Sequence, residues 1–90
     1  MPNELVETSH GTIAFIDTKG DGVPVVMVHA NSVCKESFAP QIDALAGIRR
    51  VIAFDLLGHR ASADALNPKR TYGMGGYADA LLEALEIMGV

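Results

Sequence analysis

The sequence is poor in the residues that mark disulfide-stapled, nucleic-acid-binding or membrane-spanning proteins. Cys34 is its only cysteine, so the chain cannot form an internal disulfide. Seven lysines and arginines stand against eleven acidic residues, and the formal charge of −4 disfavours a phosphate-binding surface, which needs clustered cations. No apolar run approaches the roughly 18 residues that a bilayer span requires. We therefore expect no nucleic acid and no membrane among the partners of this protein.

The N-terminus carries no recognisable targeting signal, and the length allows for one hydrophobic core. The first residues, MPNELVE, include two acids and no cationic region before an apolar stretch, so the cytoplasm is the expected location. Ninety residues suffice for one small domain, which we place at residues 1–90. A chain this short leaves about 35–40% of its unfolded surface exposed after folding, so a partner that covers more surface would stabilise it.

Four short runs rich in β-forming residues predict four strands. The first two flank Ser9-His10-Gly11 and predict a hairpin, because turn residues separate two β-rich runs. The last two are apolar without alternation, which is typical of strands covered on both faces. The four predicted strands are Glu4–Glu7, Thr12–Ile16, Pro24–His29 and Arg50–Phe54.

Two helices are predicted from apolar residues at helical spacing, one between the last two strands and one near the C-terminus. Ser37 is a candidate N-cap of the first helix and Gly47 its stop, whereas Gly89 ends the second. The stretch from Ala63 to Gly76 is interpreted as a loop, because Pro68 and three glycines interrupt any period. The apolar positions are Phe38, Ile42, Leu45 and Ala46 in the first helix, and Tyr77, Ala78, Leu81, Leu82, Leu85 and Met88 in the second.

These elements predict an α/β fold: an open, mostly parallel sheet, made of the N-terminal hairpin and two parallel strands, with helices on both faces. Parallel strands need a crossover connection, and helices on each face cover the sheet. Ligands of such sheets bind beyond the carboxyl ends of the strands. The candidate functional segments are therefore residues 29–32 and 55–62.

Three segments resemble the N-terminal third of the α/β-hydrolase fold. They are VVMVHANSVCKESFAPQIDAL, VIAFDLLGHRAS and YGMGGYADALLEAL, and the resemblance covers nearly the whole chain from Gly11 to Val90. The resemblance implies that the four strands lie in the order first, second, fourth, third. It also implies a serine-type hydrolase of a small ester, lactone or similar acyl substrate.

In that family, the backbone N–H of the residue after a His-Gly pair forms part of the oxyanion hole. The resemblance therefore assigns this donor to Asn31, and such a donor contributes about 3–4 kcal/mol in the transition state. The Asn31 side chain and Ser32 are candidate substrate contacts, and His29 is assigned a supporting, structural role. From the residues alone, a turn residue after a strand is the favoured interpretation of Asn31, and only the resemblance favours the oxyanion role.

The sequence departs from the family pattern at two glycine positions and before the last helix. Ala30 and Arg60 stand where the family has glycine. A left-handed backbone at Arg60 would cost on the order of 1 kcal/mol. Asp55, at the end of its strand, is expected to pin its own loop. The residues Gly73-Met74-Gly75-Gly76 offer no side-chain cap, so the first turn of the last helix should fray.

The catalytic nucleophile of the family is missing, since no Gly-x-Ser-x-Gly occurs and none of the four serines lies in such a turn. Cys34, with His29 or His59 as base, is a weaker alternative nucleophile. Ligand spacing for a metal is absent, and neither a metal nor another cofactor is expected. The residues weighed for a metal were His10, His29, Asp55 and His59.

Three interpretations remain open at this point. The chain is the N-terminal segment of a hydrolase and is inactive by itself, or it is a non-catalytic homodimer that pairs through the Val25–His29 strand at the edge of the sheet. In the third interpretation, it is a gene remnant or assembles with a separately encoded C-terminal half.

Overall fold

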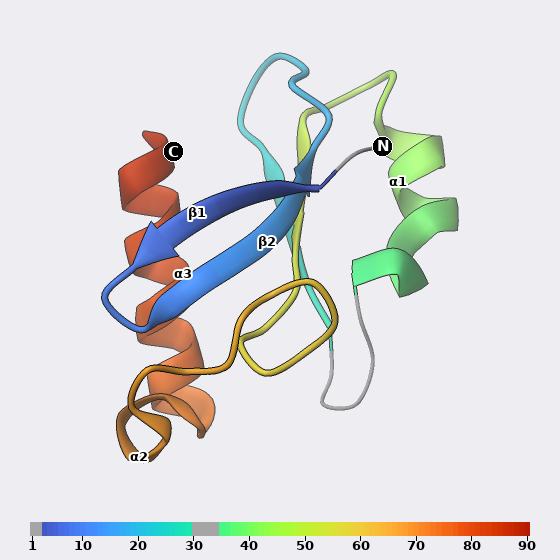
Figure 1. Ribbon diagram of the computed structural model, residues 1–90. Helices are drawn as coiled ribbons and strands as arrows, with labels where there is room; N and C mark the ends of the chain where they lie inside the picture. Colours follow the sequence, from blue (N-terminus) through green and yellow to red (C-terminus); the bar gives the residue numbers. More distant parts are fainter. Residues whose placement is uncertain (1–2, 30–34) are drawn as a thin grey trace.

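A four-stranded mixed sheet separates two helical layers in the computed structural model, which describes residues 3–29 and 35–90 (Figure 1). The sheet order is β1-β2-β4-β3, which confirms the order implied by the resemblance. Helix α1 lies on one face of the sheet and α3 on the other, as predicted (Figure 1). The elements are β1 (Glu4–Thr8), β2 (Gly11–Asp17), β3 (Val25–Val28), the 3-10 turn η1 (Lys35–Phe38), α1 (Ala39–Leu45), β4 (Val51–Phe54), α2 (Pro68–Thr71) and α3 (Met74–Met88).

Strands β1 and β2 form the predicted antiparallel hairpin around Ser9 and His10. Val6 of β1 is buried while Leu5 is 65% exposed, so one face of this strand meets the core and the other meets water. The turn closes at Gly11, whose φ of +143° suits glycine. The hairpin therefore supplies one outer edge of the sheet.

Strand β4 is the central element of the sheet, since all four of its residues are buried. It pairs with β2 in antiparallel and with β3 in parallel orientation. Among the described residues, no further strand pairs with β3, which lies at the second edge. The parallel pairing of β3 and β4 places their carboxyl ends side by side.

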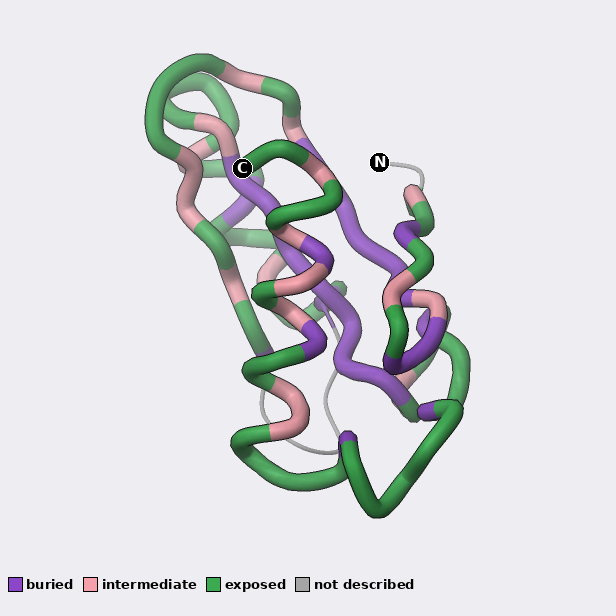
Figure 2. The backbone as a smooth tube through the Cα atoms, turned by 90° about the vertical axis from the view of Figure 1, so that its left-hand side faces the viewer, coloured by how far each residue is buried: buried purple, intermediate pink, exposed green. Residues whose placement is uncertain are grey.

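Two hydrophobic clusters pack on the two faces of β4, because its side chains alternate between the faces. Ile52 and Phe54 face α3, and the Phe54 ring lies 5.9 Å from that of Phe15. Val51 and Ala53 face α1 and contact its Ile42. Figure 2 shows this buried strand running through the middle of the molecule.

Two predictions, about the start of the first helix and about the long loop, were wrong. Ser37 lies inside η1, and α1 has no side-chain cap; its first turn instead contains Pro40, whose fixed φ suits a helix start. The C-cap of α1 is Ala46, so the helix ends directly before Gly47, as predicted. The stretch read as a loop contains α2, because Pro68 opens a helix there rather than breaking one.

Helix α3 begins after Gly73, which caps it without a side-chain hydrogen bond, and ends at Gly89 as predicted. Gly89 adopts a left-handed φ of +79°, and its N–H donates to the carbonyl oxygens of Leu85 and Glu86. The two glycines of the first turn differ in surroundings. A Cβ at Gly76 would collide with the backbone carbonyl oxygens of Arg70 and Thr71, whereas a Cβ at Gly75 would meet nothing within 4 Å.

We therefore expect opposite effects from two adjacent substitutions. Gly75→Ala should stabilise the protein by about 0.5–1 kcal/mol, because alanine loses less conformational entropy than glycine in a helix. Gly76→Ala should destabilise it by about 1–3 kcal/mol, because α2 must move away from α3. Urea unfolding of both variants measures the difference, and equal effects would contradict the close approach of α2 and α3.

Candidate functional site

The candidate site lies at the carboxyl ends of β3 and β4, where the sequence placed it. His29 directly follows β3, and Asp55, Leu56 and Leu57 directly follow β4; all four are buried. Asn31 and Ser32, the predicted oxyanion and substrate contacts, lie outside the described residues, and their roles stay predictions. The same holds for Ala30 and Cys34.

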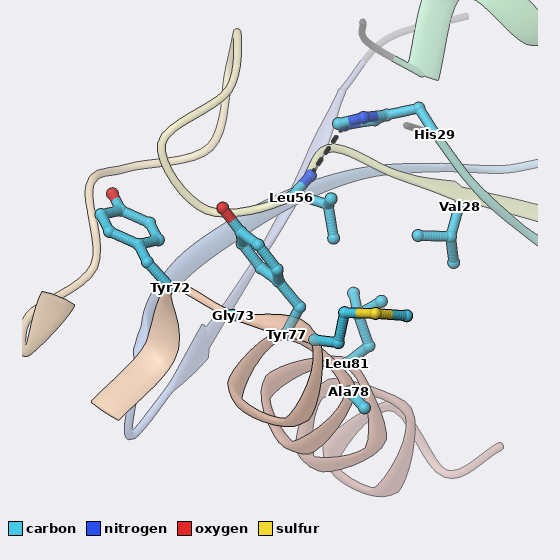
Figure 3. Close-up of a pocket in the computed structure, with 9 residues that line it drawn as sticks. Val28, His29, Leu56, Tyr72, Gly73, Tyr77, Ala78 and Leu81 are labelled. Atoms are coloured by element: carbon cyan, nitrogen blue, oxygen red, sulfur yellow. Dashed lines mark hydrogen bonds between the residues drawn. The ribbon is translucent and has the colours of Figure 1, made fainter. Parts of the chain in front are cut away.

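The His29 side chain ties the end of β3 to the chain that follows β4. Its Nε2 accepts a hydrogen bond of 3.0 Å from the backbone N–H of Leu56 (Figure 3). A backbone N–H can only donate, so Nε2 is the unprotonated nitrogen of this imidazole. Nε2 also lies 3.9 Å from Oδ1 of Asp55, and the His29 ring centre lies 4.9 Å from that of His59. This geometry suits a structural role, because the nitrogen that could take up a proton is already occupied.

Asp55 holds the other end of the predicted oxyanion segment. Its Oδ1 accepts the backbone N–H of Lys35 at 2.8 Å, and its Oδ2 contacts the Lys35 ammonium at 2.5 Å. Both side chains are almost completely buried. Oδ2 also accepts the N–H of Ala61 at 3.3 Å, so Asp55 pins its own loop, as expected, and in addition binds η1.

Lys35 remains charged in this buried position because two carboxylates surround it. Burial alone would lower the pKa of its ammonium, but the hydrogen bonds to Asp55 and Glu36 outweigh that effect and raise the pKa above the ordinary value. The Lys35 hydrogen bond in turn lowers the pKa of Glu36, whose side chain is half exposed. The ion pair therefore persists throughout the neutral pH range.

Sequence reasoning missed Lys35, and no signal in the sequence could have singled it out. Lysine is almost never fully buried unless it is paired, so the side chain of a lysine in a loop is expected to be exposed to solvent. Its partner Asp55 is 20 residues away in the chain. Only the parallel crossover between β3 and β4 brings the two residues together.

The loop after β4 is fixed by Ser62 and contains a left-handed residue. The Ser62 hydroxyl donates to the backbone carbonyl of Asp55 at 2.6 Å and accepts the N–H of Ala14 at 2.7 Å. Arg60 has a φ of +42°, which confirms the left-handed backbone considered for it. The loop therefore turns through a left-handed arginine at Arg60.

An apolar cavity of about 650 Å³ opens beside His29, between the end of β3 and the start of α3. Val28, His29 and Leu56 form its sheet side, and Tyr77 and Leu81 are among the residues on its helix side (Figure 3). This volume lies within the usual range for small-molecule sites. The cavity borders the predicted oxyanion segment through His29.

Two tyrosines add polar groups to the cavity. Tyr72 accepts the backbone N–H of Ala65 at 3.1 Å through its hydroxyl, and its ring centre lies 5.9 Å from that of Tyr77. Burial raises the pKa of the Tyr77 phenol above its ordinary value, and Tyr72 adds to the shift. The Tyr77 phenol therefore keeps its proton at neutral pH and can donate a hydrogen bond.

Residues 3–29 and 35–90 contain no cluster of three His, Cys, Asp or Glu side chains that could hold a metal ion. Within the same ranges, no helix has both the length and the apolar character to cross a membrane. His10, weighed above as a ligand, is buried against Thr71, with 2.6 Å between Nδ1 and the hydroxyl oxygen.

The fold and the sequence both match solved structures of hydrolases. N-acyl homoserine lactonase AidH, solved with N-butanoyl homoserine, is 45% identical with a TM-score of 0.91 over 100% of this chain and 33% of its own. An esterase from Thermogutta terrifontis is 27% identical with a TM-score of 0.81, over 99% and 33% of the two chains. Epoxide hydrolase VrEH1 from Vigna radiata is 22% identical with a TM-score of 0.84, over 99% and 29%, and shows the fold alone.

This chain spans about a third of the length of these solved structures. No family model matches the sequence, and no curated protein matches it. The similarity of this chain to hydrolases is therefore a similarity to solved structures, and in the case of the lactonase it includes 45% sequence identity.

The buried ion pair leads to a stability prediction. Lys35→Met should destabilise the protein by about 3–5 kcal/mol, because it leaves the Asp55 carboxylate buried without a cation. Combining it with Asp55→Asn should cost less than the sum of the two single changes, since the unpaired charge is then gone. The free energies of unfolding of the three variants, measured by chemical denaturation, give the coupling energy between Lys35 and Asp55.

Lys19→Met is the matched control. Lys19 contacts Glu4 at 3.1 Å, but its side chain is 67% exposed, so this change should cost less than about 1 kcal/mol. Additive effects of Lys35→Met and Asp55→Asn would show that the two side chains do not act as a pair.

Proposed function

This chain has the N-terminal part of the α/β-hydrolase fold, and on that premise we propose that it supplies the oxyanion side of a hydrolase. The proposed substrate is a small lactone, ester or similar acyl compound. The backbone N–H of Asn31 stabilises the negative charge that develops on the substrate carbonyl oxygen, and the Asn31 side chain and Ser32 contact the substrate. His29 positions the segment without carrying a proton.

The observation that supports this proposal most directly is the anchoring of the Asn31 segment on both sides. His29, before the segment, binds the N–H of Leu56, and Lys35, after it, binds Asp55 through both its N–H and its ammonium. An oxyanion donor is effective only when it is already in place before charge develops. Two buried anchors within six residues are what such a preorganised donor requires.

Among acyl substrates, an N-acyl homoserine lactone is the best supported. The solved lactonase is 45% identical to this chain, whereas the epoxide hydrolase at 22% bears on the fold alone. The cavity beside His29 is lined largely by apolar side chains, including Val28, Leu56 and Leu81. Such a lining suits the acyl chain of the substrate, while the carbonyl group faces Asn31.

The attacking nucleophile is not among the groups that these 90 residues offer. The sequence contains no Gly-x-Ser-x-Gly turn, so attack on the carbonyl carbon depends on groups beyond this segment. The 90-residue chain alone should therefore leave lactones and esters intact. The chain contributes binding and oxyanion stabilisation, and both effects require the rest of a complete site.

A chimera tests the proposal, in which residues 1–90 replace the matching third of the lactonase AidH. We expect the chimera to hydrolyse N-butanoyl homoserine lactone. Asn31→Pro removes the backbone N–H and should lower kcat about 10²–10³-fold with little change in KM. Asn31→Ala keeps the N–H and is the matched control: it loses only the side-chain contact with the substrate, so KM should rise while kcat stays near that of the unsubstituted chimera.

The folded state of each chimera is verified by circular dichroism and a cooperative thermal transition. A folded chimera without turnover would overturn the proposed substrate class. Equal kcat values for Asn31→Pro and Asn31→Ala would remove Asn31 from the oxyanion hole, whatever the substrate.

A further inference from the structure

A second hollow, of about 380 Å³, lies between the start of β1, the turn η1 and the loop after β4. None of its described lining residues belongs to β3 or α3, so it is separate from the apolar cavity beside His29. Polar and charged side chains dominate its lining, which suits a small polar ligand rather than an acyl chain. The lining residues are Asn3, Lys35, Glu36, Arg60 and Ala61.

Arg60 stands at this hollow in an unfavourable backbone conformation. Its φ of +42° lies in the left-handed region, where a side chain strains the backbone and glycine does not. The Arg60 side chain is exposed and forms no hydrogen bond or ion pair with any of residues 3–29 and 35–90. Strained backbone of this kind is common at ligand-binding sites. The guanidinium of Arg60 is therefore a candidate ligand contact.

The Lys35 ammonium is the second cation at the hollow, and Glu36 indicates what it binds there. The Lys35 side chain is 1% exposed, and its Nζ lies 2.8 Å from a carboxylate oxygen of Glu36. The Glu36 side chain is 45% exposed, so it can turn into water while the buried pair of Lys35 and Asp55 stays intact. Ion pairs with an exposed partner contribute little free energy. The position beside Lys35 thus accepts a carboxylate and can exchange it for another.

We propose that this hollow binds a small monocarboxylate ligand, which replaces Glu36 beside Lys35 and is held on its other side by Arg60. A guanidinium offers two parallel N–H donors that match the two oxygens of a carboxylate. The charges balance in this arrangement, because Lys35 and Arg60 face Asp55 and the ligand while Glu36 is solvated. A dianion would leave one negative charge unpaired. The site is independent of the proposed hydrolase function, since it is measured by binding without turnover.

Titration of the isotope-labelled protein with sodium acetate, followed by NMR, tests the proposal. We expect saturable shifts of the backbone amide of Ala61 and of the side-chain N–H of Arg60, with a dissociation constant in the millimolar range. Sodium chloride at the same ionic strength is the reference and should not produce them. Equal shifts in the two salts would overturn the proposal. Tighter binding of inorganic phosphate than of acetate would contradict the monocarboxylate.

Two substitutions in the hollow should change the Kd for acetate in opposite directions. Glu36→Gln removes the competing carboxylate at nearly constant size, so the Kd should fall about tenfold. Arg60→Gly removes the guanidinium, and the Kd should rise at least about tenfold. Glycine also relieves the left-handed strain, so Arg60→Gly should fold at least as well as the unsubstituted protein. A cooperative thermal transition verifies folding, and lost binding then reports on the ligand contact.

Arg49→Gln is the control for the loss of one positive charge. Arg49 is also exposed, but it contacts the carbonyl oxygen of Val23 and does not line the hollow. Its substitution should leave the Kd unchanged. A Kd that does not fall in Glu36→Gln would show that no ligand takes the place of Glu36. A Kd that Arg60→Gly and Arg49→Gln change equally would reduce the role of Arg60 to net charge. Either result rejects the proposed site.

Discussion

The buried carboxylate of Asp55 is the group on which the arrangement of the candidate site depends. It ends the central strand and accepts hydrogen bonds from two separate parts of the chain, at Lys35 and at Ala61. A carboxylate buried this deeply is stable only when its charge is paired and its oxygens are bonded. One buried carboxylate therefore holds both loops. The segment that carries Asn31 is flanked by His29 and Lys35, and both of these residues make buried hydrogen bonds.

The second constraint concerns β3, which has a neighbouring strand on only one side among the described residues. The central strand β4 is buried completely, and its neighbour β2 nearly so, but β3 has only β4 beside it among the described residues. The valines of β3 consequently remain partly exposed next to an apolar cavity. The same edge thus borders the candidate site through His29.

These two features concern different parts of the candidate site. The anchors of the oxyanion segment are local to β3, β4 and the loops that follow them, so they form within the 90 residues. A nucleophile, in contrast, must come from a turn of a kind that these residues do not include. The hydrolases of similar fold are about three times as long as this chain.

The sequence by itself determined the four strands, their order through the family resemblance, and both main helices. These features follow from apolar periodicity and from motifs that are local in the chain. It failed where local signals have two meanings: Pro68 begins a helix instead of breaking one, and Ser37 lies in a 3-10 turn instead of capping α1. Only the tertiary structure decided the burial of Lys35 against Asp55 and the binding of His29 to Leu56, because these contacts join residues 20 and 27 positions apart through the crossover.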